Sequence, residues 1–530
     1  MSDAGAIIKR LEALTTLRSP NESVWRDCFK YTFPLRGSGF QSEKLNAQAG
    51  QDRKAELVDS TGTDAARILA SGIMSGVTPA NSLWFQLGVE NATDEEARWL
   101  EAAAQTTFEA IHGANFDSAG FECCLDVVSA GWFALYIDSD KDGLVFEQWP
   151  LSQVYVAASK RGGAIDTVYR DFELSAEAAV AEYGDECSEA TRKLAEKKPD
   201  DMVRFVHAIY PRTDGYIKGS LLSKHLAIES CQVEVKAKKI VREGGYNEMP
   251  VVVPRWHKLP DSAYAIGPAF DALPDMKMLN ELKRLELANT DIAVAGMWKA
   301  VDDGVLNPRT VTVGARKIIS MADVNSMVPL ETGADFNIAF QQEERLQAVI
   351  RKVFMADQLQ PQDGPQMTAT EVHVRVGLIR QLLGPVYGRL QSEYLAPMIE
   401  RCFGLLQRMN AFAEAPPASL DQRGYTVKYI SPLARAQRQE EVTAMDQFEN
   451  TLAAEAQVNP NVLDVYDWDN AVRERSKLLG VPQKLILSED DTKSVRDARI
   501  QVQQQQQQQA AIQAGAQSFA TTAGQQLATH

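Results

Sequence analysis

The sequence predicts an α+β protein that is mostly α-helical and contains an antiparallel β region. Before residue 130 and after residue 275, apolar residues recur at steps of three and four, which is typical of amphipathic helices. Between residues 132 and 256, short runs rich in β-branched and aromatic residues alternate with turn residues, which is typical of strands joined by turns. A chain of 530 residues has room for two to four domains with substantial cores.

Composition and charge exclude several classes of protein. Hydrophobic residues make up 45% and charged residues 24% of the chain, as in ordinary soluble globular proteins. The net charge of −16 argues against a general basic surface that grips nucleic acid. No run reaches 18 apolar residues and the first residues lack an apolar leader. We therefore expect no membrane span, and a protein that stays in the cytoplasm where it is made.

The sequence lacks the motifs of common enzymes. The six cysteines include no CxxC pair, and the six histidines include no pair at metal-ligand spacing. A phosphate-binding P-loop, an HExxH motif and a GxSxG motif are also missing from the sequence. We therefore predict no catalytic residue, no metal site and no cofactor.

Residues 138–143, Asp-Ser-Asp-Lys-Asp-Gly, match the first half of a calcium-binding loop. The twelfth position of such a loop should hold a bidentate Glu, but here it is Trp149, and the flanking segments are predicted strands rather than helices. A polar hairpin turn is the favoured interpretation, and weak cation binding is the alternative.

The first part of the chain is predicted to be helical. We expect separate helices over residues 4–18 and 22–33, because Ser19, Pro20 and Asn21 disfavour a continuous helix. The other elements expected before residue 131 are a capped helix over 61–76, a strand over 83–87, and helices over 94–114 and 116–130.

The β region begins after Gly131. One charged helical segment, over residues 175–198, interrupts it. The strands expected on either side cover residues 132–137, 144–149, 154–158, 164–172, 203–212, 226–230, 233–235 and 250–256.

Two further helices, with short strands between them, are expected over residues 275–299 and 340–356. Arg351 and Lys352 end the second helix, where positive charge suits the negative end of the helix dipole. These two side chains form either a solvated face or contacts to phosphate groups.

A loop rich in Pro, Gly and Gln, residues 357–367, leads into an overlong amphipathic helix over 368–413. A Thr-x-x-Glu capping box marks the start of this helix, which would span roughly 65–70 Å. Pro385 and Pro397 each remove a backbone donor, so we expect kinks there. The elements expected after it are a strand over 425–430, helices over 435–457, 460–466 and 469–479, and a Gln-rich helical tail from Ser488 with a frayed end.

Six segments, in this order, are similar to the head-to-tail connector, or portal, proteins of short-tailed double-stranded DNA phages. They are residues 59–62 (DSTG) with the following helix, 79–87 (PANSLWFQL), 245–256, 267–280, 368–372 (TATEV) with Arg375, and 431–434 (SPLA). None of them is catalytic, but their order and spacing extend the resemblance over roughly residues 20–485.

The resemblance implies a non-enzymatic ring, usually of twelve subunits, around a DNA channel at one capsid vertex. It implies packaging and ejection of double-stranded DNA, with the terminase large subunit, tail adaptor or nozzle proteins, and capsid and scaffolding or core proteins as partners. It also implies a virion protein that is assembled in the host cytoplasm. The implied parts are a wing (1–265, helical to about 130 and mixed α+β after it), a first stem helix (266–299), a small β-containing clip (300–337), a second stem helix (338–356), a tunnel loop (357–367), a long kinked helix (368–413), a helical crown (414–487) and a C-terminal helix or barrel (488–530).

The same resemblance suggests which residues face the DNA channel. The candidates are Arg351 and Lys352 at the stem end and Gln358, Gln360, Gln362, Asp363 and Gln366 of the tunnel loop. Mostly uncharged side chains suit DNA that must slide, because tight phosphate binding would stall it. Two alternatives stay open: a large α-rich enzyme built on carboxylates such as those of Asp138, Asp140 and Asp142, and a non-portal interaction scaffold that uses the Gln-rich tail.

Overall fold

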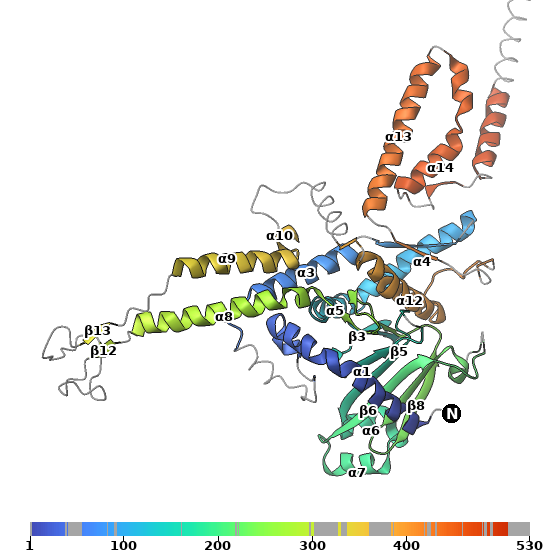
Figure 1. Ribbon diagram of the computed structural model, residues 1–530. Helices are drawn as coiled ribbons and strands as arrows, with labels where there is room; N and C mark the ends of the chain where they lie inside the picture. Colours follow the sequence, from blue (N-terminus) through green and yellow to red (C-terminus); the bar gives the residue numbers. More distant parts are fainter. Residues whose placement is uncertain are drawn as a thin grey trace, which may run out of the picture. The chain divides into compact units, whose positions relative to one another are not determined.

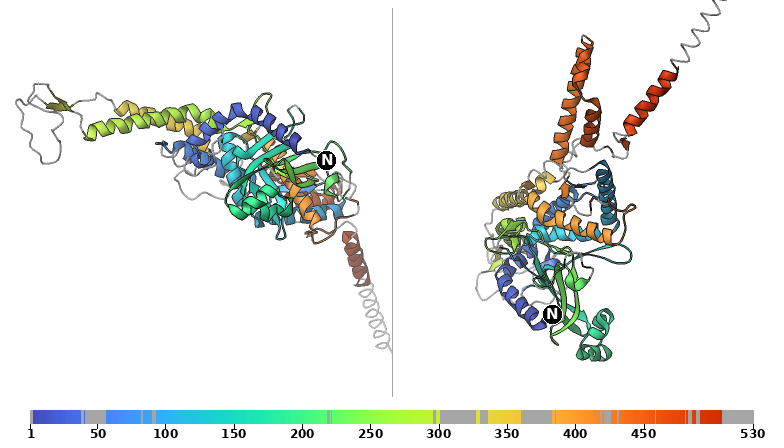
Figure 2. Two further views of the ribbon diagram at one scale, coloured as in Figure 1. Left: turned by 90° about the horizontal axis from the view of Figure 1, so that it is seen from below. Right: turned by 90° about the vertical axis from the view of Figure 1, so that its right-hand side faces the viewer.

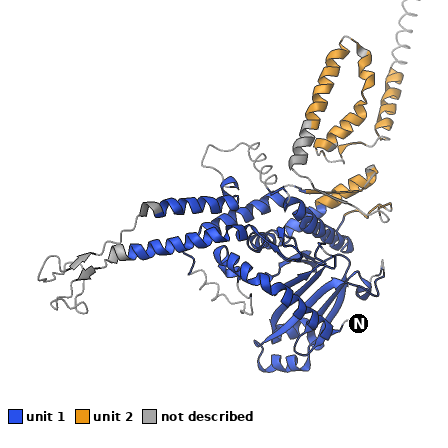
Figure 3. Cartoon of the chain, in the orientation of Figure 1, with its two compact units in different colours: residues 1–84, 106–412 blue, residues 85–105, 413–530 orange. Residues whose placement is uncertain are grey.

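The chain combines helices with antiparallel strands, which confirms the α+β class (Figure 1). It divides into two compact units: unit 1 comprises residues 1–84 and 106–412, and unit 2 comprises residues 85–105 and 413–530 (Figure 3). The computed structural model describes residues 3–37, 40, 56–81, 83–89, 93–160, 162–217, 220, 222–295, 298–300, 327–329, 336–359, 383–384, 386–417, 419–420, 426–429, 432–457, 459–479, 481, 485–487 and 491–506.

Unit 1 begins with a single long helix, α1 (Ala4–Tyr31), so the prediction of two helices was wrong. Pro20 lies inside this helix. Buried Arg18 and Glu22 form an ion pair of 2.7 Å across the proline, and Arg18 also donates to the carbonyl of Val154. Together with apolar side chains that are buried on both sides of the proline, such as Leu14 and Trp25, these contacts keep the helix continuous despite the lost backbone hydrogen bond.

The next helices confirm their predictions. They are α3 (Thr61–Val77), α4 (Asp94–Gly113) and α5 (Phe116–Ala130). Helix α5 ends at Gly131, which has a left-handed backbone with φ of +85°. A Cβ atom at Gly131 would lie 2.0 Å from the carbonyl carbon of Ile266, so only glycine allows this close approach.

Two antiparallel sheets make up the β region. The larger has the order β4-β5-β6-β7-β8, and the smaller has the order β3-β2-β9. Short helices α6 (Ala176–Tyr183) and α7 (Glu189–Lys197) lie in the β5–β6 connection. The strands are β2 (Leu135–Ser139), β3 (Leu144–Gln148), β4 (Val154–Ala157), β5 (Thr167–Ser175), β6 (Met202–Pro211), β7 (Ile228–Glu234), β8 (Lys239–Tyr246) and β9 (Val251–Val252).

Two strand predictions here were wrong. The strands expected over 226–230 and 233–235 form one strand, β7, whose pairing with β8 shifts register between Gln232 and Val233. Strand β8 was not predicted, because Gly244 and Gly245 weaken its local preference for a strand. Hydrogen bonding to β7 along its whole length stabilises β8 despite this weak local preference.

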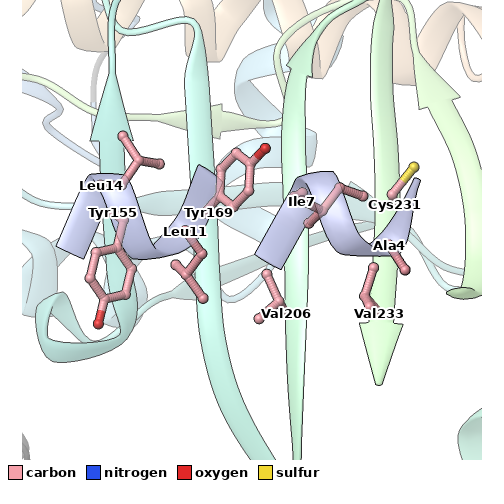
Figure 4. Packing of buried hydrophobic residues seen from close by; sticks show 10 residues of the cluster. Ala4, Ile7, Leu11, Leu14, Tyr155, Tyr169, Val206, Cys231 and Val233 are labelled. Carbon is pink, nitrogen blue, oxygen red and sulfur yellow. The ribbon is translucent and has the colours of Figure 1, made fainter. Parts of the chain in front are cut away.

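Helix α1 covers one face of the larger sheet (Figure 4). Ala4, Ile7, Leu11 and Leu14 recur at steps of three and four, and all are buried. They pack on the side chains of Tyr155, Tyr169, Val206, Cys231 and Val233 from four neighbouring strands. A further hairpin, β10 (His257–Lys258) with β11 (Ala265–Ile266), connects this part to the next helix.

The two helices predicted after residue 267 are α8 (Pro268–Ala295) and α9 (Phe336–Val353). Helix α8 begins seven residues earlier than predicted, with Pro274 inside it, because buried Ala269 and Ala272 pack its first turns against the core. Residues 298 and 299, expected to be helical, instead belong to β12 (Trp298–Ala300), which pairs with β13 (Met327–Pro329). The predicted strands over 305–321 lie outside the described residues.

Residues 357–359, expected in a loop, belong to the short helix α10 (Ala356–Leu359), where Leu359 packs on Gly72 of α3. Residues 360–367 and 368–382 lie outside the described residues.

The described part of the long helix contains a π-helical segment (Gln391–Leu395) directly before α12 (Ala396–Arg408). The amide of Ala396 donates to the carbonyl of Gln391, and Pro397 has no amide hydrogen to continue either pattern. The helix is therefore widened next to Pro397. The kink expected at Pro397 stays a prediction, and Pro385 lies outside the described residues. The helix ends at Arg408, earlier than predicted, because Asn410 adopts a left-handed conformation with φ of +53°.

Unit 2 pairs β1 (Phe85–Gly88) with β14 (Thr426–Tyr429), which lies far away in the sequence. Helices α13 (Pro432–Ala456) and α14 (Trp468–Leu479) pack together through an Arg475–Glu449 ion pair. The segment Pro460–Val465, expected to be α-helical, is a 3-10 helix. A last described helix covers residues 491–506. In the described part of the chain, no helix is both long and apolar enough to cross a bilayer.

Candidate nucleic-acid interface

Helices α8 and α9 run side by side in opposite directions and carry the β12–β13 pair at their far end (Figures 1 and 2). Lys283 of α8 joins them: its Nζ lies 2.5 Å from Oε1 of Glu343 on α9 and 3.3 Å from Oε2 of Glu286. Partial burial lowers the pKa of Lys283, but hydrogen bonds and charge from Glu343 and Glu286 outweigh it, so this pKa is raised. The link aligns residue 283 with residue 343 along the pair.

The inner side of this pair packs on α3. Leu346, Ile350 and Phe354 are buried. Met276 of α8 approaches α3 so closely that a Cβ atom at Gly62 would lie 2.5 Å from its sulfur. This packing holds the pair rigidly at its base.

The predicted cations lie on the outside of α9. Arg351 and Lys352 occupy its last turn, and both are exposed. No carboxylate among the described residues pairs with either of them, or with Arg345 two turns earlier. Exposed, unpaired guanidinium and ammonium groups can contact phosphate oxygens, weakly in a chain of net charge −16.

Sequence reasoning missed Arg345. Its spacing of seven residues from Lys352 was the available signal, since such residues share one side of a helix. Gln358 is exposed on α10, next to the end of α9. The other tunnel-loop candidates, Gln360, Gln362, Asp363 and Gln366, lie outside the described residues. The assignment of these side chains to a DNA channel stays a prediction.

The sequence matches the family described as bacteriophage head to tail connecting protein over residues 4–487. The chain belongs to this family. Membership in the head to tail connecting family confirms the resemblance drawn from the six segments, and it does not favour the enzyme or scaffold alternatives. It implies a structural component of the virion at the head–tail junction, which forms a ring.

Several relatives carry the word portal in their names. A probable portal protein of Bordetella phage BPP-1 is 28% identical over 539 residues, covering 97% of this chain and 94% of that protein. The portal protein of Salmonella phage epsilon15 is 26% identical over 543 residues, covering 98% and 95%. The portal protein of Escherichia phage T7 is 21% identical over 426 residues, covering 77% and 76%.

In this head to tail connecting protein, the calcium-like motif at residues 138–143 is the β2–β3 turn. One carboxylate oxygen of Asp140 accepts from the amides of Asp142 (2.8 Å) and Gly143 (3.1 Å). Asp138 instead accepts from the hydroxyl of Tyr136 at 2.6 Å. Asp140 thus closes a hairpin turn, as the favoured interpretation predicted, and Asp138 also lies 3.5 Å from the Arg401 guanidinium of α12.

Another group of potential metal ligands, Glu229, Cys231 and Glu243, lies on β7 and β8. The carboxylate of Glu229 already accepts from the Tyr210 hydroxyl at 2.9 Å and lies 3.3 Å from the Arg212 guanidinium. The group therefore serves to join neighbouring strands.

Ion pairs fasten the long helix to the β region. Buried Arg255 donates to both oxygens of Glu393, at 2.7 and 3.0 Å, within the π-helical segment. Glu248 receives Arg401 at 3.1 Å and Arg408 at 2.7 and 2.8 Å. Burial raises the pKa of Glu248, but both arginines lower it, so the net shift of this pKa is downward. Glu248 is therefore a carboxylate at neutral pH.

Proposed function

We propose that this chain is the repeating subunit of a portal ring of twelve copies, a passive channel for double-stranded DNA during packaging and ejection. Family membership over residues 4–487 supports the role in the virion. The observation that carries the channel is the end of α9, where Arg351 and Lys352 are exposed and unpaired among the described residues. Two cations per copy give weak phosphate contacts, which allow DNA to move along the channel.

The proposed parts keep their sequence boundaries: wing 1–265, stem 266–299 and 338–356, clip 300–337, tunnel loop 357–367, long helix 368–413, crown 414–487 and barrel 488–530. The clip docks the terminase large subunit and later the tail adaptor or nozzle proteins. Capsid and scaffolding or core proteins surround the ring, which assembles in the host cytoplasm. Energy for packaging comes from the terminase and not from this chain.

Electron microscopy of the purified protein tests the ring. Two-dimensional class averages should show closed rings with a central hole, and their symmetry gives the number of copies. A monodisperse monomer under all assembly conditions would rule the proposal out.

Binding of purified rings to double-stranded DNA at several salt concentrations tests the channel face. The double variant Arg351→Gln, Lys352→Gln should flatten the plot of log affinity against log salt by at least about 0.9, roughly the slope of one phosphate contact. Lys197→Gln, Lys198→Gln is the matched control, because these lysines are also consecutive, exposed and at a helix end. An equal change in both variants would count against α9.

A further inference from the structure

Helix α8 is covered on three sides by its own chain. Toward α1, Lys277 Nζ lies 2.6 Å from Asp27 Oδ2. Toward residues 56–59, Asn280 Oδ1 accepts from the amide of Val58 at 2.7 Å. Toward α9, Lys283 binds Glu343 at 2.5 Å. None of these described neighbours covers the remaining long side of the helix.

A line of mostly apolar residues follows that open side, between the exposed charged side chains of Asp271 and Arg284. Phe270, Met278 and Leu285 are 38%, 61% and 54% exposed. With Pro274 and Glu281 they recur at steps of four, four, three and four, and so form a stripe about 22 Å long. We call these five residues the α8 stripe. Glu281 is its one charged member, and its partner within the chain is exposed Arg284 at 3.3 Å.

The neighbouring helix has the opposite character. The exposed positions of α9 are mostly polar, as expected for a helix with one buried side. Phe340 and Val349 are exceptions, at 59% and 37% exposure, and Val349 lies one turn from Arg345, which has no carboxylate partner among the described residues. The helix pair therefore presents one apolar face that carries an acid and one flank where a base lies beside an apolar residue.

Contacts around a ring are heterologous: each copy uses two different surfaces, and rotation about the ring axis does not change height along it. The Lys283–Glu343 link aligns residue 283 with residue 343, and both helices rise about 1.5 Å per residue. Measured along the helix pair, Glu281 therefore lies level with Arg345, and Met278 lies within one residue of the level of Val349. These levels are equal heights in a ring whose axis runs along the pair.

We infer that the α8 stripe of one copy packs against the Arg345–Val349 flank of α9 in the next copy, pairing Glu281 with Arg345 and Met278 with Val349. The inference rests on the proposed ring. In this contact an acidic residue meets a basic one at the same level of the two helices. The contact also covers the side of α8 that its own chain leaves open. It places Arg345 in the subunit contact and not in the channel. Lys352 lies on the same side of α9 as Arg345, at the edge of that contact, while Arg351, on another side, stays free for the channel.

A charge exchange tests the pair. Glu281→Arg and Arg345→Glu should each raise the protein concentration needed for half-maximal ring assembly by at least about tenfold, because each places like charges in the contact. The double variant should return this concentration to within about threefold of wild type. Glu189→Arg, Lys193→Glu is the control, since this exposed pair lies on α7. Single variants that assemble like wild type, or a double variant worse than both, would overturn the inference.

The apolar part has its own matched control. Met278→Glu should shift the protein from the ring to the monomer position in size exclusion, with an unchanged circular dichroism spectrum. Met202→Glu changes a methionine of nearly equal exposure, 59% against 61%, and should still form rings.

Intact Met278→Glu rings that fail to bind another virion protein would assign the stripe to that protein and overturn the inference, while the proposed function would stand. A wild-type chain that never forms rings would defeat both.

Discussion

Two glycines bring the end of α5 and the start of α8 into direct backbone contact. A Cβ atom at Gly131 would lie 2.0 Å from the carbonyl carbon of Ile266, and one at Gly267 would lie 2.7 Å from the carbonyl oxygen of Val127. The carbonyl of Gly131 also accepts from the amide of Trp256 at 2.7 Å. The first turn of α8 is thus positioned by main-chain atoms, which no side-chain change can adjust.

Gly131→Ala should therefore cost much more stability than an ordinary glycine replacement. Gly215→Ala is the control, because Gly215 has nearly the same positive φ (+82°) but no atom lies within 4 Å of its would-be Cβ. The control should lose about 1–2 kcal/mol from the left-handed backbone alone, and Gly131→Ala more than about 3 kcal/mol. Urea unfolding measures both, and equal losses would contradict the role of the backbone contact.

His207 makes the β region sensitive to acid. Its Nε2 lies 2.9 Å from the Ser230 hydroxyl, and burial, with Arg170 and Arg242 nearby, lowers its pKa from 6.5 to about 3. Between these values the unfolded chain binds a proton that the folded chain does not, so stability falls as the pH decreases through this window. Above pH 6.5 the histidine is neutral in both states and contributes nothing to the pH dependence.

Replacing His207 by Gln should therefore flatten the stability profile. From pH 6 down to pH 4, the wild type should lose up to about 1.4 kcal/mol per pH unit more than His207→Gln. Urea midpoints at pH 7, 5 and 4 test this, and parallel profiles would show that another group is responsible.

At the scale of elements, the Arg255–Glu393 pair fastens the π-helical segment to the strand region. Both side chains are buried, and removing Arg255 leaves the buried Glu393 carboxylate with only the partly exposed Lys258, at 3.3 Å, among its two described cation partners. Arg255→Met should lose about 3–5 kcal/mol of stability. Arg204 makes the same two-pronged contact with Asp171 at 2.6 and 2.7 Å, but its side chain is 51% exposed. Arg204→Met should therefore lose less than about 1 kcal/mol.

Thermal or urea unfolding of the two variants measures the effect of burial on stability, because the two arginine–carboxylate contacts have the same geometry. Similar losses would mean that solvent exposure does not control the contribution of these arginines.

Element prediction from sequence succeeded where periodicity was long and failed where distant contacts override local preference. Pro20 and Pro274 are helix breakers by propensity, yet the Arg18–Glu22 pair and the buried Ala272 keep α1 and α8 continuous. Strand β8 needed its partner β7 to form.

The residues of the candidate site also differ in whether the sequence alone could predict them. Arg351 and Lys352 were found because they stand at a predicted helix end. The pairing of Glu281 with Arg345 required the alignment of α8 with α9, and nothing in either segment alone reveals it. The contact of Lys283 with Glu343 supplies that alignment.

At the scale of the whole molecule, the inferred contact between copies lies on α8 and α9, and the Gln-rich tail is not part of it. Deleting residues 488–530 should therefore leave ring assembly intact. The described tail helix is held by exposed contacts such as Arg496 with Asp469, so its removal should cost the rest of unit 2 little. Negative-stain images of the truncated protein should show rings. If they show only monomers, the tail is required for assembly.

The β1–β14 pair has a consequence for how the protein is made. Strand β1 ends at Gly88 and β14 begins at Thr426, so about 340 residues are synthesised between the two halves of this sheet. At roughly 5–20 residues per second, β1 emerges from the ribosome about 17–70 s before its partner exists. During that interval its amide and carbonyl groups form an open edge, which can pair with another nascent chain. The sheet of unit 2 therefore cannot form until most of the chain has been synthesised.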